Sequence, residues 1–529
     1  IALAADHQCW EVNRKARIAL DSPADLHRFS TYGSGDVYAL LPSGGERNGV
    51  QCRVGMATGA ALWRIEPDAG RTVRVKIPLS TAGKGQSHGR SRSWDEALAG
   101  AGRLRVPDAR SQRLYEAALR TLVLHAPGEV YPGPYTYKRF WFRDAAFILH
   151  AMILAGLTDR VGRVLESFPS RQLSNGFFRS QEGEWDSNGE ALWILERYCE
   201  LTGRPPADGW RQAAERGASW ILHKRLPPHP DSPYAGLLPA GFSAEHLGPN
   251  DYYYWDDFWG VAGLRAAASL LESSGVSGSM VSRLRGSASE FLEIIEASLA
   301  RVEEHIGSPA MPASPNRRLD SGAIGSLVAG YPLVLWGPRD RRLLATTDYL
   351  LANCFVAGGF FQDMIHSGIN PYLTLHVAQV LLRAGDERFA LLRERVAELA
   401  SPTGQWPEAI HPRTLGGCMG DGQHVWAAAE WVMMMRNSFL REEGEALILA
   451  SGLPPLWLES GEGLFFGPAP SRWGPVTVRA EMSDGEPRVS WSAEWRTLPA
   501  RVEVRLPGRQ PIVSRPEAGS VSWREATAR

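Results

Sequence analysis

Cysteine is scarce in this sequence, and the few residues present show no pattern of a metal site or a disulfide framework. The five cysteines, Cys9, Cys52, Cys199, Cys354 and Cys418, lie far apart, and none belongs to a Cys-x-x-Cys pair. We therefore expect free, mostly buried thiols, no metal ion, and a reducing compartment such as the cytoplasm. The sequence begins with Ile and lacks a charged leader region, so we expect a trimmed N-terminus in which a signal peptide would not be visible.

Long hydrophobic runs and an excess of charge are also missing. No stretch of about 18 apolar residues occurs, so nothing in the sequence predicts a membrane-spanning helix. Lys plus Arg number 57 and Asp plus Glu number 58, without a basic run, which argues against nucleic acid or an anionic membrane as a partner. The sequence has no P-loop, and we expect no cofactor. It does not predict the oligomeric state.

Segments at both ends of the chain have the alternating pattern of β-strands. Between residues 1 and 92, the stretches VQCRVGM, ALWRI and TVRVKIPL are separated by Gly, Asp and Pro turns, which predicts a small β-sandwich-like domain. Between residues 451 and 529, PVTVRAEM, PRVSWSAEW and RVEVRLP alternate in the same way and predict a β-rich segment. The 529 residues leave room for one large domain between them, from 93 to 450.

The middle of the chain has the 3.6-residue periodicity of amphipathic helices. It predicts twelve helices, at 108–126, 143–156, 158–168, 186–203, 208–225, 256–274, 279–305, 319–333, 338–353, 370–384, 386–400 and 421–441. The connections before the even-numbered helices are mostly long and rich in Gly, Pro and aromatic residues, whereas those after them are short. This alternation is typical of stacked helical hairpins. We therefore expect a mainly α protein with an (α/α)6 barrel, a toroid of six hairpins whose long loops gather at one mouth.

Acidic and aromatic side chains recur where the even-numbered helices begin. These candidate binding residues are Trp141, Arg143, Asp144, Trp185, Asp186, Tyr254, Trp255, Asp256, Asp257, Trp406, Asp421 and His424. Asp at a helix start is commonly an N-cap, and that interpretation stays open for each residue taken alone. Capping does not require aromatic neighbours, however, and the four rings at 252–255 cannot all point into a core. We therefore predict a polar, aromatic-lined pit that binds carbohydrate, in which the histidine is a hydrogen-bonding group and not a metal ligand.

Two loops before even-numbered helices carry carboxyl groups that suit glycoside hydrolysis, which needs one protonated and one ionised carboxyl group. Glu245 lies on a Gly- and Pro-rich loop where packing against rings would favour the protonated form, so we predict that it is the general acid. Asp251 in the same loop is the alternative acid. Glu408, on the loop before the twelfth helix, is the predicted general base. The alternative for each glutamate is an exposed loop residue without a catalytic role.

Four stretches resemble, in order, the motif series of the six-hairpin glycosidase superfamily. They are YKRFWFRDAAFILHAMILAG, DSNGEALWILERY, GLLPAGFSAEHLGPNDYYYWDDFWGVAGL and GQWPEAIHPRTLGGCMGDGQHVWAAAEW. They are most similar to bacterial glucoamylase-like and glycogen-debranching-like glycoside hydrolases. The resemblance implies an (α/α)6 barrel and an inverting mechanism with two carboxylates. It also implies that Trp141, Arg143 and Asp144 hold the sugar in the subsite that is cleaved.

The same resemblance implies that Glu245 is the acid and Glu408 the base. The sequence departs from glucoamylases at both, because SAEH stands where they have a Trp-Glu pair and Pro407-Glu408-Ala409 replaces their paired glutamates. We predict a glycoside hydrolase, inverting and exo-acting on an α-linked glucoside or oligosaccharide. The alternatives are a catalytically silent carbohydrate-binding protein on the same fold, or a polysaccharide lyase or phosphorylase. A lyase would need a Tyr or His base, and a phosphorylase would need a basic phosphate pocket.

Overall fold

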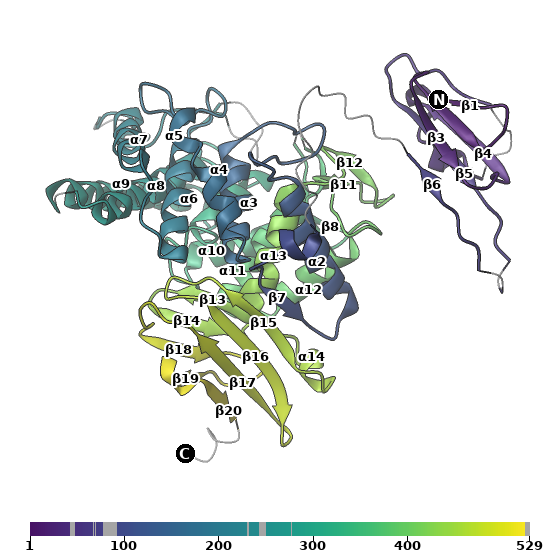
Figure 1. Ribbon diagram of the computed structural model, residues 1–529. Helices are drawn as coiled ribbons and strands as arrows, with labels where there is room; N and C mark the ends of the chain where they lie inside the picture. The colour runs from purple at the N-terminus through teal and green to yellow at the C-terminus, as the bar shows by residue number, and fades with distance from the viewer. Residues whose placement is uncertain are drawn as a thin grey trace. The chain divides into compact units, whose positions relative to one another are not determined.

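The computed structural model describes residues 1–42, 48–66, 68, 70–77, 93–229, 232–242, 250–276, 278–364 and 366–523 (Figure 1). Contacts between residues divide the chain into two units, Ile1–Ser91 and Arg92–Arg529. In the described part of the chain, no helix is both long and apolar enough to cross a lipid bilayer.

The N-terminal unit consists of short strands. β1 (Ala2–Leu3), β2 (Cys9–Val12), β3 (Ala16–Leu20) and β6 (Val75–Lys76) form one sheet, while β4 (Leu26–Thr31) pairs with β5 (Ala57–Leu62). Two 3-10 turns, η1 (Tyr32–Ser34) and η2 (Val37–Leu40), follow β4. The predicted strand VQCRVGM is wrong, because Gly55 takes a left-handed conformation and its N–H donates to the carbonyl of Cys52 in a turn. The strand begins only after this turn.

The cysteines are free thiols, as expected, but most of them are not buried. Only Cys9 is buried, three others are half-buried, and Cys418 is exposed. The expectation of mostly buried thiols is therefore wrong, because four of the five cysteines are partly or fully exposed.

Each of the twelve predicted helical runs contains a helix. After α1 (Trp94–Ala97), they are α2 (Ala109–Leu124), α3 (Phe142–Leu154), α4 (Thr158–Leu165) with the short α5 (Phe168–Arg171), α6 (Ser187–Thr202), α7 (Trp210–Lys224), α8 (Tyr254–Ser273), α9 (Gly278–Ile306), η3 (Ser321–Ala329), α10 (Arg341–Asn353), α11 (Pro371–Ala384), α12 (Arg388–Glu398) and α13 (Val425–Phe439). The eighth run, η3, is a 3-10 helix.

Burial separates these helices into two classes that alternate along the chain. α3, α8, α11 and α13 are buried at almost every position, whereas α9 is buried only along one stripe of residues three or four apart. The fully buried helices approach one another closely where glycines face each other. A Cβ on Gly263 of α8 would stand 2.7 Å from the Cα of Gly189 in α6, which no side chain permits.

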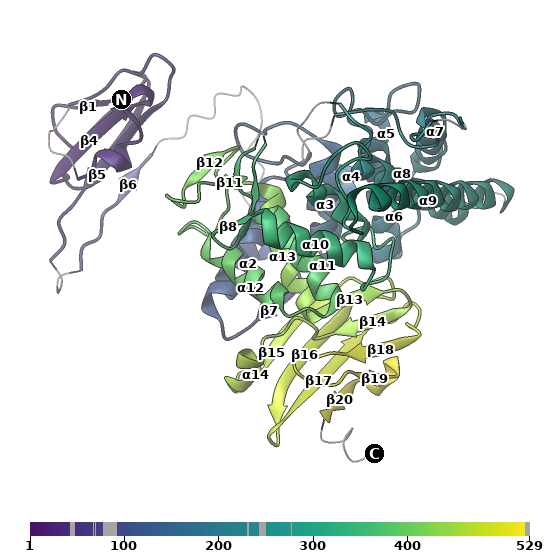
Figure 2. The same ribbon diagram turned by 180° about the vertical axis from the view of Figure 1, so that it is seen from behind.

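The four helices α3, α8, α11 and α13, together with α6 and η3, form a closed series of contacts. α3 contacts α6, α6 contacts α8, α8 contacts η3, η3 contacts α11, α11 contacts α13, and α13 contacts α3. Figure 2 shows these helices from behind, with the C-terminal strands beside one end of them. The helical part of the chain is thus organised around a central group of buried helices.

Two sheets follow the last helix. β13 (Leu440–Glu443), β14 (Ala446–Leu449), β18 (Arg501–Val504) and β19 (Ile512–Ser514) form one, with β14 and β18 parallel. The other has the order β20 (Ser520–Ser522), β17 (Glu486–Ala493), β16 (Val476–Ser483), β15 (Leu464–Ala469) and β7 (Arg103–Arg105). Two short helices, α14 (Pro455–Glu459) and η4 (Pro516–Ala518), lie in the connections. The three strands predicted here are confirmed, but the first hairpin begins at 440 and not at 451. The boundary at residue 450 stays a prediction.

A small sheet was not expected from the sequence. β8 (Phe355–Val356), β9 (Gly359–Gln362), β10 (Gly368–Ile369), β11 (Ala409–Ile410) and β12 (Gly417–Met419) form five adjacent antiparallel strands. The sequence assigned these residues to loops because the strands have only two to four residues each, too few for an alternating pattern. This sheet brings the segment before α11 next to the segment before α13.

Candidate active site

A cavity of about 250 Å³ lies where α3, α11 and α13 begin. It is lined by Pro132, Tyr137, Trp141, Arg143, Asp144, Gln181, Glu184, Phe242, His366, Tyr372, Glu408, His424 and Trp426. These residues come from helix starts and from the loops that precede α3, α6, α8, α11 and α13. The loops before α3, α6, α8, α11 and α13, which are the second, fourth, sixth, tenth and twelfth predicted helices, therefore meet at one cavity.

Glu408 is a buried carboxylate of this cavity with hydrogen bonds to both of its oxygens. It lies directly before β11 and is only 5% exposed. The Tyr137 hydroxyl donates to its Oε2 at 2.6 Å, and Nδ1 of His366 is 2.5 Å from its Oε1. Both carboxylate oxygens are thus in hydrogen bonds, one from the loop before α3 and one from the loop between β9 and β10.

These contacts decide the ionisation of Glu408. Burial is the largest effect on its pKa and raises it, but the His366 hydrogen bond and the electrostatic interactions with His424 and His366 lower it. The Tyr137 hydrogen bond lowers it further, and the net result is a pKa below the ordinary glutamate value. Glu408 is therefore ionised at neutral pH, although it is buried.

Asp421 fixes the loop that carries Tyr137. Its carboxylate accepts backbone N–H bonds from Tyr135, Thr136 and Tyr137 at 3.3, 2.8 and 3.0 Å. Burial raises its pKa, but the three backbone bonds outweigh burial and lower it. The neighbouring Gly420 has a positive φ of 68°, and a Cβ there would lie 2.2 Å from Oε2 of Glu408. Glycine is therefore required where the 420 loop passes the carboxylate.

Arg143 also lines the cavity and is a buried cation surrounded by acidic side chains. Its Nη2 lies 2.6 Å from Oδ2 of Asp186, and its Nη1 lies 3.5 Å from Oε1 of Glu184. Burial, followed by the charge of Asp186, raises the pKa values of Glu190 and Asp256 well above the ordinary range. Both shifts favour the protonated, uncharged forms of these acids, which limits the uncompensated negative charge near Arg143.

Five of the predicted site residues line the cavity. They are Trp141, Arg143, Asp144, Glu408 and His424. Arg139 stacks on Trp141 with its guanidinium carbon 3.6 Å from the ring centroid, so one face of this indole is covered by a cation. Their roles in binding or catalysis stay predictions.

The other predicted binding residues do not line the cavity. The buried ones held by hydrogen bonds are Trp185, Asp186, Tyr254, Trp255, Asp257, Trp406 and Asp421, and Asp256 is also buried. Trp255 donates to Asp186 at 2.8 Å, and Trp406 donates to the carbonyl of Val396 at 2.7 Å. N-capping does not explain Asp186 either, because this residue at the start of α6 makes no side-chain capping bond. The rings at 252–255 are not all buried, as expected. Tyr252 is the one that is partly exposed, since the other three are at most 1% exposed.

The two candidate acids lie in different situations. Asp251 does not line the cavity, because its carboxylate accepts hydrogen bonds from Ser314 at 2.6 Å and from Asn316 at 2.8 Å. Glu245 lies outside the described residues. Phe242, the last described residue before it, lines the cavity.

Sequence reasoning missed several residues of the cavity. Tyr137, Glu184, His366 and Tyr372 were not predicted, although Glu184 stands directly before the Trp185-Asp186 pair that was. His366 had no signal in the sequence, since only the small sheet brings it to Glu408. Among the described residues, no three His, Cys, Asp or Glu side chains lie together so as to hold a metal ion.

Comparison with known proteins gives a fold but no family. No protein-family model and no curated protein matches the chain. Among solved structures, the GH78 family rhamnosidase of Bacillus sp. GL1 has a TM-score of 0.55 at 15% identity, over 94% of this chain and 54% of that one. The two share a fold.

Two further solved structures have lower scores. A bacterial glucoamylase complexed with acarbose has a TM-score of 0.48 at 12% identity, over 80% of this chain and 71% of that one. A protein named as a glycosidase, solved in its wild-type form, also has a TM-score of 0.48, at 15% identity, over 62% of this chain and 98% of that one. The rhamnosidase match confirms, at the level of fold, the sequence resemblance to glycosidases.

Proposed function

We propose that the chain is a glycoside hydrolase, that the cavity around Glu408 is its active site, and that the buried helices form the inner ring of an (α/α)6 barrel. The contacts that run from α3 through α13 and back to α3 support the barrel. The fold shared with a rhamnosidase supports the reaction class. The observation that carries the proposal is Glu408, a buried carboxylate kept ionised at the wall of an aromatic-lined cavity.

In this proposal Glu408 is the general base. It accepts a proton from a water molecule while the water oxygen attacks the anomeric carbon, and the configuration of that carbon inverts. Glu245 gives its proton to the leaving glycosidic oxygen, so that one sugar and one alcohol are formed. Glu408 and Glu245 should stand about 6.5 to 9.5 Å apart, because a water must fit between the base and the sugar. Among the described residues, Asp144 and Glu184 are the other carboxyl groups that line the cavity.

The size and lining of the cavity support action on a terminal sugar. A volume of about 250 Å³ is below the range of about 300 to 1,000 Å³ usual for small-molecule pockets. Trp141, Tyr372 and Trp426 offer ring faces for the C–H surface of a sugar, and Asp144 and Gln181 offer hydrogen-bonding groups for its hydroxyls. We therefore propose exo-action on an α-linked glucoside or short oligosaccharide, with α-rhamnosides as the neighbouring class to compare.

The test is a pair of substitutions assayed on aryl α-glucosides, aryl α-rhamnosides and malto-oligosaccharides. Glu408→Gln and Glu245→Gln should each lower kcat by about 10² to 10⁴, the usual contribution of a general acid or base, while sugar binding remains. The matched control is Glu394→Gln on the exposed face of α12, which should keep full activity. NMR of the first product should show inversion. Full activity of Glu408→Gln would exclude Glu408 as the general base, whereas a wild-type protein that binds sugar but hydrolyses none of these substrates would be a carbohydrate-binding protein.

A polysaccharide lyase is the second candidate, because Tyr137, His366 and Arg143 also line the cavity. A lyase needs a base and a cation that neutralises a uronate. Burial and the charge of Glu408 raise the pKa of Tyr137 far above its ordinary value, which makes this hydroxyl a poor base. Arg143 is engaged by Asp186 and Glu184. An unsaturated product, detected by its ultraviolet absorbance on a uronate polymer, would favour the lyase and contradict the hydrolase.

A further inference from the structure

A second cavity, of about 290 Å³, lies at the C-terminal ends of the buried helices, which we call the inner helices, whereas the candidate active site lies at their N-terminal ends. Its walls come from the C-terminal parts of α3, α6, α11 and α13, from the 331–334 segment after η3, and from β13. The candidate active site, in contrast, is formed where the inner helices begin. The second cavity has therefore no part in the mechanism proposed above.

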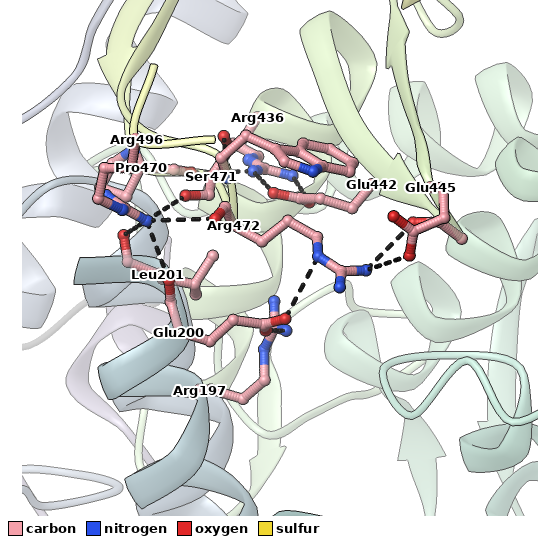
Figure 3. Close-up of polar contacts among 12 residues, drawn as sticks. Arg197, Glu200, Leu201, Arg436, Glu442, Glu445, Pro470, Ser471, Arg472 and Arg496 are labelled. Carbon is pink, nitrogen blue, oxygen red and sulfur yellow. Dashed lines mark hydrogen bonds and ion pairs between the residues drawn. The ribbon is translucent and has the colours of Figure 1, made fainter. Parts of the chain in front are cut away.

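Arginine dominates the polar wall of this cavity. Arg197, Arg383, Arg436, Arg441 and Arg472 line it, and Glu442 is the carboxylate among its lining residues. Figure 3 shows Arg197, Arg436 and Arg472 together with their acidic partners. The pKa of the buried His150 in the same wall is lowered well below its ordinary value, first by burial and then by the charges of Arg197 and Arg436. These two positive charges therefore disfavour the protonated form of His150.

Several of these arginines are explained by bonds within the protein. Both terminal nitrogens of Arg436 bind Glu442, at 2.7 and 2.8 Å, and Arg383 binds Glu443 and two backbone carbonyls. Arg472 lies 3.4 Å from Glu200 of α6, and the nearby Arg496 donates to the carbonyl of Glu200, so this network joins the C-terminal sheets to the helices (Figure 3).

The contacts that join the helices to the C-terminal sheets do not explain the remaining guanidinium N–H donors. Arg441 is 4% exposed, and its Nη1 donates to Glu443 at 2.8 Å. Nothing in the described residues accepts a hydrogen bond from its Nε or Nη2, and the same holds for Nε of Arg436. Buried guanidinium donors without acceptors are strongly unfavourable, and in native proteins such groups usually face a water molecule or an ion. These three donor atoms are buried, and they belong to two arginines that line the cavity.

The remaining wall of the cavity is apolar. Trp193, Tyr331, Leu333 and Met433 line it. A bare inorganic anion would use only the arginine wall. A molecule with an organic body and one anionic group would use both.

We propose that this second cavity binds a small organic molecule that carries an oxyanion, a phosphate or a carboxylate, with the anion on Arg436, Arg441 and Arg472. Arginine binds such groups through paired N–H donors, and each charge-assisted bond is stronger than a neutral one. The proposal does not depend on the function of the candidate active site. It concerns a ligand site at the other end of the same helices.

Isothermal titration calorimetry on the full chain, in a phosphate-free buffer at low salt, tests the proposal. The probes are inorganic phosphate, phenyl phosphate and benzoate, with benzyl alcohol as the uncharged control, because none of them is a sugar that the candidate active site would bind. We expect one site that binds an anionic probe at millimolar concentration or better and weakens as salt is added. The phosphate and benzoate probes distinguish the two anions. Absence of binding by all three anionic probes, or equally tight binding of benzyl alcohol, overturns the proposal.

Substitutions place the binding at this cavity. Arg441→Gln should weaken it by about ten- to a hundredfold, the worth of one or more charge-assisted bonds. Because Arg441 is buried, this variant can fail to fold, so Arg472→Gln, whose side chain is 35% exposed, is the second variant, with an expected loss of about tenfold. The matched control is Arg488→Gln, an exposed arginine of β17 that binds Ser520. Full affinity of the folded cavity variants, or an equal loss in Arg488→Gln, would show that the anion binds elsewhere.

Discussion

The hydrogen bond from Tyr137 to Glu408 allows a sharp test of the proposed base. Tyr137→Phe removes only the hydroxyl that donates to Oε2 at 2.6 Å and leaves the ring and the His366 contact in place. Because this bond lowers the pKa of Glu408, its loss raises that pKa. The fraction of ionised base then falls at acidic pH and stays unchanged well above the new pKa.

The size of the effect follows from the strength of such a bond. A hydrogen bond to a charged group contributes about 1.5 to 3 kcal/mol, and each 1.36 kcal/mol corresponds to a factor of about ten in ionisation. On the acidic limb of the profile, kcat/KM should therefore fall by about ten- to a hundredfold. At neutral and alkaline pH the loss should be small.

The assay is kcat/KM against pH for the wild type and the variant on the best glycoside of the panel. Tyr135→Phe is the matched control, since this neighbour's side chain is 85% exposed. Its profile should superimpose on that of the wild type. A Tyr137→Phe profile with the same acidic limb as the wild type, or a uniform loss at all pH values, would refute the role of this bond in keeping Glu408 ionised.

Two further predictions concern stability. Asp421→Asn cannot accept all three backbone bonds of the 135–137 loop, so it should lower the free energy of unfolding by about 1 to 3 kcal/mol, measured by thermal melting against the exposed control Asp208→Asn; equal melting temperatures would contradict it. Burial raises the pKa of Asp257 to about 8, so the folded protein retains a proton that the unfolded chain releases, and stability should fall as pH rises between about 4 and 8. Asp257→Asn keeps an acceptor for the Leu238 N–H and should flatten this slope in denaturant titrations, whereas an unchanged slope would exclude Asp257 as its source.

The helices could be predicted from the sequence because each buries a face with a clear period. α8 is rich in apolar residues on nearly every side, and α9 carries them along one stripe, so both patterns differ clearly from the sequences of the loops. The strands of the small sheet around Glu408 are too short for any period. Their existence depends on contacts between segments that are distant along the chain.

The site was predicted in part for a related reason. A motif at a helix start gives the position along the axis but not the rotation about it, and successive residues point about 100° apart. Arg143 and Asp144 face the cavity, whereas Asp256 and Asp257 turn into the wall. Tyr137 and His366 could not be found at all, since no sequence pattern links either residue to Glu408, which both contact in the structure.

The strand β7 has a consequence for how this protein can be made and cut. It precedes the first long helix, yet it pairs with β15, which follows the last one. A ribosome must therefore synthesise the whole helical part before Leu104 finds its partner, and an expression boundary at residue 450 would leave that edge of β7 without its neighbour. New chain ends for a circular permutation of this unit, or a hinge for domain swapping, should therefore lie in an exposed loop and not at the junction between the helices and the sheets.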